Sequence, residues 1–145
     1  MNRSDLKRIL GSAPMEESVV EPLAIPADYR VLVVDDISTN CIVAKRILER
    51  IGVPYVDTAT NGEAALALAA ERPPNLVLTD LWMPGVSGGD LEKALHERLP
   101  DLPVVAITAD NDRDEKRFPE QPGFRCVVQK PLTVENLHKV LKDIL

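Results

Sequence analysis

Val31-Leu32-Val33-Val34 is an unbroken apolar run that ends in two acids, Asp35-Asp36. A run of this length predicts a short strand buried on both faces, as in a parallel sheet. Residues 38–51 follow with apolar side chains at helical spacing, and Gly52 can adopt the left-handed conformation that ends a helix. A buried strand that leads directly into an amphipathic helix predicts the first unit of an α/β fold.

The same alternation continues to the C-terminus. We expect four more strands, at residues 55–58, 76–78, 104–107 and 126–128, and four more helices, at residues 61–71, 90–99, 110–118 and from 133 onward. Right-handed crossovers between successive strands place them in one parallel sheet with helices on both faces. Residues 1–28 are interrupted by prolines and acids, which indicates a linker or arm. The sequence therefore predicts an arm at 1–28 and one α/β domain at 29–145.

Length and composition narrow the classes of function. The chain has 145 residues, enough for one ordinary domain. Its 23 acidic residues outnumber the 17 basic ones, and a net charge of -6 argues against binding to nucleic acid. No apolar run approaches the roughly 18–20 residues that span a bilayer, so we expect no membrane insertion. Cys41 and Cys126 show neither a disulfide framework nor zinc-ligand spacing, which favours a reducing, cytoplasmic setting.

Polar side chains follow four of the predicted strands at the point where each strand ends. They are Asp35 and Asp36 after the first, Asp80 after the third, Thr108 after the fourth and Lys130 after the fifth. Taken singly, an Asp or Thr there is most often a helix cap or turn residue. In an open parallel sheet, however, the carboxyl ends of the strands form one edge, where ligands bind. We therefore expect these five side chains to converge.

Three carboxylates, a hydroxyl and an ammonium at one edge suit phosphoryl transfer. Clustered carboxylates repel one another unless a cation intervenes, and Mg²⁺ prefers such oxygen ligands. A carboxylate can accept a phosphoryl group as an aspartyl phosphate. Positive charge from Mg²⁺ and Lys130 and a hydrogen bond from Thr108 would stabilise that group. Asp80 is the nucleophile in this interpretation.

The sequence resembles the receiver domain of two-component response regulators over Tyr29 to Leu145. The resemblance rests on Val33-Val34-Asp35-Asp36, Thr79-Asp80-Leu81-Trp82-Met83-Pro84-Gly85, Ile107-Thr108-Ala109 and Lys130-Pro131, in this order and spacing. It implies a flavodoxin-like (βα)5 three-layer sandwich, whose five-stranded parallel sheet has the order 2-1-3-4-5. It also implies a cis peptide bond at Lys130-Pro131.

The resemblance implies a role for each residue at the strand ends. Asp80 would be the phosphoacceptor. Asp36, Asp80 and the backbone carbonyl of Trp82 would ligate Mg²⁺, for which Mn²⁺ can substitute, and Asp35 would help through water. Thr108 and Lys130 would bind the phosphoryl oxygens. The domain would then be a signalling domain that catalyses its own phosphorylation and dephosphorylation, and not an enzyme acting on other substrates.

The expected partner is a histidine kinase or a histidine phosphotransfer domain. Asn40 and the Lys130-Pro131-Leu132-Thr133 ending are similar to receivers found within hybrid histidine kinases. Position 127 is Val, where many receivers carry a switching aromatic residue, and prolines at 119 and 122 flank the predicted fourth helix. Both features weaken the surface that many receivers use to dimerise. We therefore expect a monomer that relays phosphate and docks its partner around Ile37, Cys41 and Ile42.

Three alternatives have weaker support. A phosphorylation-independent interaction module on the same fold usually lacks an acid, the acceptor or the lysine, and none is missing here. A Mg²⁺-dependent phosphatase with an Asp nucleophile typically separates its two acids by one residue, whereas Asp35 and Asp36 are adjacent. A dinucleotide-binding enzyme would show Gly-x-Gly-x-x-Gly after the first strand, which is absent. His96 and His138 fall on predicted helices, and we expect both at the surface.

Overall fold

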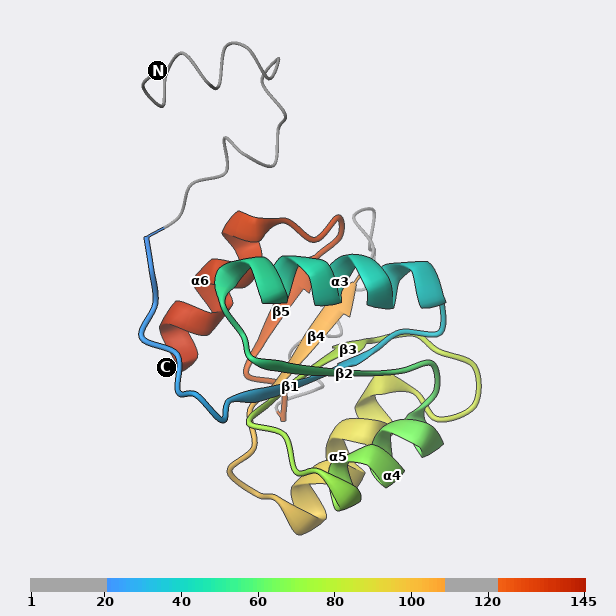
Figure 1. The fold of residues 1–145 in the computed structure, drawn as a ribbon. Helices are drawn as coiled ribbons and strands as arrows, with labels where there is room; N and C mark the ends of the chain where they lie inside the picture. The colour runs from blue at the N-terminus through green and yellow to red at the C-terminus, as the bar shows by residue number, and fades with distance from the viewer. Residues whose placement is uncertain (1–20, 109–122) are drawn as a thin grey trace, which may run out of the picture.

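The computed structural model describes residues 21–108 and 123–145. Within them, five parallel strands form one sheet in the order β2-β1-β3-β4-β5. Helices cover both faces of the sheet, which gives three layers (Figure 1). The elements are β1 (Arg30–Val34), α3 (Ser38–Ile51), β2 (Tyr55–Ala59), α4 (Gly62–Glu71), β3 (Leu76–Asp80), α5 (Gly88–Arg98), β4 (Val104–Thr108), β5 (Cys126–Gln129) and α6 (Val134–Ile144).

The flavodoxin-like sandwich and its strand order are confirmed. α3 and α6 pack together on one face of the sheet, and α4 and α5 pack together on the other (Figure 1). The peptide bond between Lys130 and Pro131 is cis, as expected. The helix predicted at 110–118, with its flanking prolines, lies outside the described residues, as do residues 1–20 of the predicted arm.

The burial of each strand follows from its place in the sheet. Every residue of β3 and β4 is buried, and so is β1 after its first residue. The edge strands β2 and β5 mix buried and exposed positions. The continuous apolar runs therefore belong to central strands covered by helices on both faces, and the more polar runs belong to the edges.

Helix ends are fixed by local hydrogen bonds. Gly52 ends α3 with φ of 119°, the left-handed conformation that the sequence predicts. Thr133 and Asn136 form a reciprocal capping box at the start of α6. α5 begins at Gly88, two residues before the predicted start, because the Ser87 side chain accepts a hydrogen bond from Asp90 N–H at 3.2 Å.

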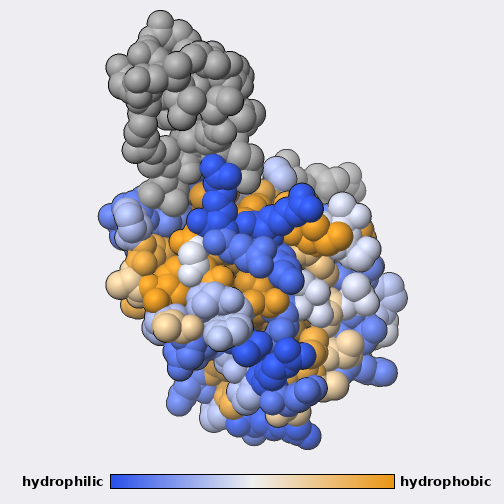
Figure 2. Space-filling view, in the orientation of Figure 1, coloured by the Kyte–Doolittle hydropathy of each residue, from blue (hydrophilic) through white to orange (hydrophobic). Residues whose placement is uncertain are grey.

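Two apolar clusters fill the space between the layers. Alternate residues of β1 enter opposite clusters: Val31 and Val33 join the cluster under α3 and α6, and Leu32 and Val34 join the one under α4 and α5. Almost all their members are aliphatic, which agrees with the low aromatic content of 3%. On the face seen in Figure 2, apolar side chains also reach the surface between groups of hydrophilic ones.

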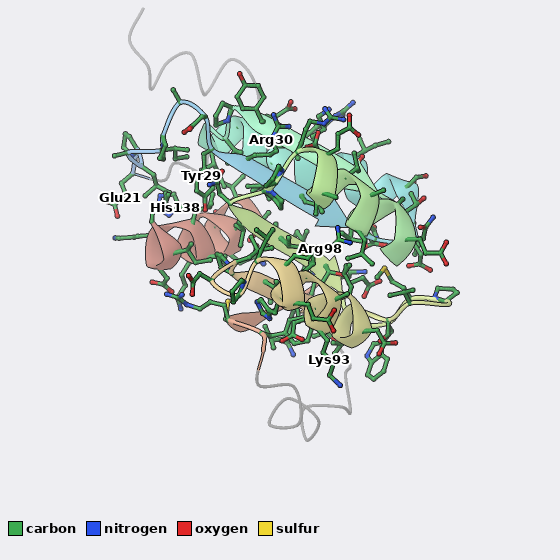
Figure 3. All side chains as sticks on the ribbon, turned by 90° about the horizontal axis from the view of Figure 1, so that it is seen from below. Glu21, Tyr29, Arg30, Lys93, Arg98 and His138 are labelled. Carbon is green, nitrogen blue, oxygen red and sulfur yellow. The ribbon has the colours of Figure 1, made fainter. Side chains whose placement is uncertain are left out.

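Residues 21–28, from the predicted arm, lie against the domain. Leu23 and Ile25 pack on the cluster under α3 and α6. The backbone carbonyl of Glu21 lies 2.7 Å from His138 Nε2, and the Glu21 carboxylate forms an ion pair with Lys142. Figure 3 shows Glu21 beside His138 of α6. The prediction that His138 lies at the surface is wrong, because only 8% of it is exposed beneath this segment.

No helix in the described part of the chain is long and apolar enough to cross a membrane.

Candidate functional site

Strand register brings the predicted side chains to one edge of the sheet. In the parallel ladders Val34 pairs with Thr79, and Asp80 pairs with Ile107. Lys130 N–H donates a hydrogen bond of 2.8 Å to the carbonyl of Thr108, which extends the pairing of β4 with β5 by one residue. This register therefore aligns the residues that follow β1 and β5 with the residues that end β3 and β4. We call this carboxyl end of the sheet, with Asp35, Asp36, Asp80, Thr108 and Lys130, the acceptor edge.

Three carboxylates meet at the acceptor edge. Asp35, Asp36 and Asp80 each offer an oxygen, and these oxygens lie within 4.8 Å of one another. Asp35 and Asp80 are buried, with 4% and 7% exposed, whereas Asp36 faces solvent. All the donors are hard oxygens, which is the chemistry that a divalent cation such as Mg²⁺ requires.

Lys130 is the cation that the structure places against these acids. Its Nζ lies 3.1 Å from Asp35 Oδ2 and 3.5 Å from Asp80 Oδ2. Partial burial opposes the charge of Lys130, but hydrogen bonds to Asp35 and the charges of Asp80 and Asp35 outweigh it and raise the pKa of the ammonium. Lys130 is therefore a fixed positive charge between the two buried carboxylates at neutral pH.

The surroundings of Asp80 disfavour the ionised form of its carboxyl. Burial raises the pKa of its carboxyl above the ordinary value, and the nearby charge of Asp35 raises it further. Lys130 and a hydrogen bond from Trp82 N–H to Asp80 Oδ1, 3.4 Å long, act in the opposite direction without cancelling the effect. A further positive charge at this position would therefore stabilise the ionised form of Asp80.

Thr108 and Trp82 flank Asp80 on neighbouring segments. Thr108 is fully buried at the end of β4. Trp82 lies in the loop after β3, and its side chain is 41% exposed. The Trp82 backbone is held close to Asp80 by the hydrogen bond to Oδ1.

Two residues near the acceptor edge were not assigned to it from the sequence. A Cβ on Gly88 would lie 2.4 Å from the Asp80 carbonyl oxygen, so only glycine allows the start of α5 to approach β3 this closely. Cys41 Sγ lies 3.4 Å from the Asp35 carbonyl oxygen, and burial raises the pKa of its thiol. In the sequence, the pair Gly88-Gly89 could have indicated the close approach at Gly88. A single Cys at helical spacing gives no comparable indication that Cys41 lies beside Asp35.

Comparison with known proteins agrees with this geometry. Residues 31–142 match the model of the response regulator receiver domain family. The aerobic respiration control sensor protein ArcB of Escherichia coli K12 is 38% identical over 125 residues, which are 84% of this chain and 16% of ArcB. The chemotaxis protein CheY of Pseudomonas aeruginosa is 34% identical over 117 residues, 79% of this chain and 94% of CheY.

A solved structure gives the same result. The response regulator TrrA of Thermotoga maritima, in complex with Mg²⁺-BeF, superposes with a TM-score of 0.71 at 28% identity, covering 81% of this chain and 99% of TrrA. This chain spans nearly all of the single-domain relatives but only about a sixth of the ArcB sensor, as the 16% coverage shows. The chain belongs to the response regulator receiver domain family of two-component signalling.

Proposed function

We propose that this receiver accepts a phosphoryl group on Asp80 from a phosphohistidine of a histidine kinase or histidine phosphotransfer domain. The observation that carries the proposal is the placement of a buried Asp80 carboxylate 3.5 Å from Lys130 Nζ and next to two further acids. Such a cluster is costly for a protein that only binds another protein, and it suits a site where negative charge is transferred.

The transfer needs only groups at the acceptor edge. A carboxylate oxygen of Asp80 attacks the phosphorus and forms the new P–O bond. The P–N bond to the donor imidazole breaks, and the imidazole leaves with the bonding electron pair. Lys130 stabilises charge on the phosphoryl oxygens, and the Thr108 hydroxyl donates a hydrogen bond to one of them. Dephosphorylation is the corresponding attack of water on the same phosphorus, releasing the Asp80 carboxylate.

The side chains that would hold Mg²⁺ are Asp35, Asp36 and Asp80, together with the backbone carbonyl of Trp82. The fit rests on the oxygens of the three carboxylates, which lie within 4.8 Å of one another, and on the raised pKa of Asp80. When bound, Mg²⁺ supplies positive charge between the acids and the phosphoryl group, and Mn²⁺ can substitute. The Mg²⁺-BeF complex of TrrA supports this assignment.

Phosphorylation by acetyl phosphate in Mg²⁺ tests the proposal. Wild type should form an acyl phosphate that is stable in acid and labile in base, and Asp80→Ala should form none. Asp28→Asn, which alters an exposed acid outside the site, is the matched control and should be labelled as wild type. Labelling of Asp80→Ala at the wild-type level would contradict the assignment. A wild type that is never labelled would favour the interaction module instead.

Trp82 offers a second readout of metal binding. It is the chain's single tryptophan and belongs to the loop that would ligate Mg²⁺. Its fluorescence should change with millimolar Mg²⁺ and again with beryllofluoride. A flat titration, with metal binding confirmed by calorimetry, would count against this position of the loop.

The proposed docking surface for the histidine-bearing helix is the start of α3 beside Asp36. Ile37, Ile42 and Val43 are exposed there, although they are large and apolar. Cys41, which the sequence also placed on this surface, is buried and packs inward. Exposed aliphatic side chains next to the acceptor edge suit a helix that must bring its histidine to Asp80.

The proposed setting is a cytoplasmic phosphorelay of the hybrid-kinase type, with the receiver monomeric. The similarity to ArcB and the presence of Asn40 support a phosphorelay of the hybrid-kinase type. Val127 in β5 supports a monomer, because it lacks the ring of a switching aromatic residue. The two free cysteines suit a reducing compartment. Sedimentation with and without beryllofluoride tests the oligomeric state, and tight dimers formed only with beryllofluoride would contradict the monomer.

A further inference from the structure

A groove between α4 and α5 has no role in the proposed phosphotransfer. Its cavity of about 220 Å³ is lined mainly by aliphatic side chains, including Leu66, Ala69 and Ala70 of α4 and Ala94 and Leu95 of α5. An apolar cavity of about 150 Å³ can hold a molecule the size of benzene. The groove therefore has room for more than one aliphatic side chain.

The outer face of α4 is apolar although part of it is exposed. No charged residue occurs from Ala64 to Ala70, and Ala67 and Ala70 are exposed. A helix on the surface of a soluble protein normally carries charged or polar residues on its outer face, and a helix that is apolar all round is normally buried. The outer face of α4 is thus suited to packing against a partner.

Arg98 gives the groove a charge. It lines this cavity and also a neighbouring one of about 310 Å³ near the amino ends of β3 and β4, where Asn75 and Asp101 contribute polar groups. Among the described residues Arg98 forms no ion pair, with Asp101 or any other acid. Its guanidinium is available to a carboxylate that enters the groove. A hydrogen bond between Arg and a carboxylate is stronger than one between Arg and a neutral group.

We propose that the α4–α5 groove binds an amphipathic helix of a partner protein. Two aliphatic side chains one turn apart enter the apolar cavity, and an Asp or Glu of the same helix pairs with Arg98. Helices commonly bind grooves in this way, with anchors at i and i+4. The charge of Arg98 selects a helix that carries a carboxylate beside its apolar anchors, and binding of a second copy of this domain is an outcome that the test distinguishes.

The groove is separate from the acceptor edge. α4 and α5 start at the carboxyl ends of the strands and run back, so the residues that line the groove near Arg98 and Pro73 lie toward the opposite end of the sheet (Figure 1). A partner helix bound there leaves Asp80 accessible. The domain can therefore hold this partner while it exchanges phosphate with a histidine protein.

The probe is a synthetic 16-residue peptide of Ala, Gln and Lys with Leu at i and i+4 and Glu at i+8. Titration into ¹⁵N-labelled full chain should give saturable NMR shifts of the amides of Ala69, Ala70, Ala94 and Leu95. Arg98→Glu should raise the Kd at least tenfold. Lys93→Glu is the matched control, because it makes the same charge change on α5 outside the groove, and the Kd should stay within twofold. Figure 3 shows Arg98 between α4 and α5, and Lys93 on the side of α5 that is away from α4.

A charge exchange separates a direct contact from general attraction. A peptide with Lys in place of the Glu should bind wild type at least tenfold more weakly, and Arg98→Glu should recover much of that loss. The comparison of the Glu and Lys peptides on the wild-type protein remains informative even where a protein variant is unstable. Absence of saturable shifts, shifts centred elsewhere, or equal effects of Lys93→Glu and Arg98→Glu would overturn the proposal. Shifts of the groove amides that depend on protein concentration alone would point to a second copy and overturn it too.

Discussion

Two groups of charged residues on the sheet differ in how far cations neutralise their carboxylates. At the acceptor edge, Lys130 is the one cation that the described residues, 21–108 and 123–145, place beside Asp35 and Asp80, and burial and the charge of Asp35 raise the pKa of Asp80. Arg30, at the amino end of β1, reaches Asp57 in the middle of β2, and this single carboxylate has two cations, with Arg30 Nη1 at 2.8 Å and Arg72 Nη1 at 3.5 Å. We call this second group of three residues the Asp57 cluster.

The difference is the one expected between a functional cluster and a structural one. The Asp57 cluster has enough positive charge for its carboxylate, and Arg30 also lies over the ring of Tyr55, 4.7 Å from its centroid. Among the described residues the acceptor edge has more acidic than basic groups, and such an imbalance is typical of functional sites. The excess negative charge is what a divalent cation and a phosphoryl group would use.

Removal of Lys130 should give the largest effect. Lys130→Met leaves the two carboxylates without their cation and removes positive charge from the transferred phosphoryl group. We expect phosphorylation by acetyl phosphate to slow by about 10²–10³-fold, the range found when one stabilising group is lost from a charged transition state. Rates are measured by intact-protein mass spectrometry at saturating Mg²⁺. Lys139→Met, on the exposed side of α6, should match wild type; an equal loss there would contradict the argument.

Gly88→Ala should give the next largest effect, on stability. The added Cβ would meet the Asp80 carbonyl oxygen at 2.4 Å and the Leu81 Cα at 2.9 Å, and backbone atoms cannot move aside cheaply. The free energy of unfolding should fall by about 2 kcal/mol, typical of an overpacked site, measured by urea denaturation. Gly89→Ala, the next residue of α5, should be neutral or slightly stabilising because Ala favours helix. Equal stability of the two variants would contradict the close approach.

The same substitution at the acceptor edge and in the Asp57 cluster should have opposite signs. Without Mg²⁺ at neutral pH, Asp80→Asn removes a carboxylate whose ionised form is disfavoured by burial and by the charge of Asp35, and it should therefore raise the free energy of unfolding. Asp57→Asn breaks contacts with both arginines and should lower stability by about 1 kcal/mol. Thermal unfolding measures both changes.

The stability difference between wild type and Asp80→Asn should depend on pH. The pKa of folded Asp80 is raised, so the ionised carboxylate destabilises the fold above that pKa and the cost disappears as the pH falls through it. The gap between wild type and Asp80→Asn should therefore close on acidification. A gap of the same size from neutral to acid pH would show that the charge of Asp80 is not its cause.

Much of the fold and of the acceptor edge was accessible from the sequence. Val31–Val34 predicts a buried central strand because such a strand must be apolar on both faces. Asp80 and Lys130 could be placed together although 50 residues separate them, because the carboxyl ends of parallel strands share an edge. These inferences depend only on strand direction and side-chain type, and the roles of the residues in catalysis stay predictions.

Contacts that depend on three-dimensional packing were not accessible. α5 begins at Gly88 and not at the predicted Asp90, because the Ser87 cap and the close approach to β3 act together. Cys41 has helical spacing that is compatible with either face of α3, and only packing places it inside. The prolines of the predicted arm indicate a stiff backbone and do not show what Leu23 and Ile25 contact.

His138 tests the docking of that arm, with the smallest expected effect. Its Nε2 lies 2.7 Å from the Glu21 carbonyl and is buried, so His138→Phe should lose a hydrogen bond while the ring still fills the space. The free energy of unfolding should fall by about 0.5–1 kcal/mol, and hydrogen exchange at residues 23–25 should accelerate. Lys142→Met breaks the exposed ion pair with Glu21 and should change neither measurement, because such pairs contribute little. Unchanged exchange in His138→Phe would mean that the packing of Leu23 and Ile25 alone holds the segment.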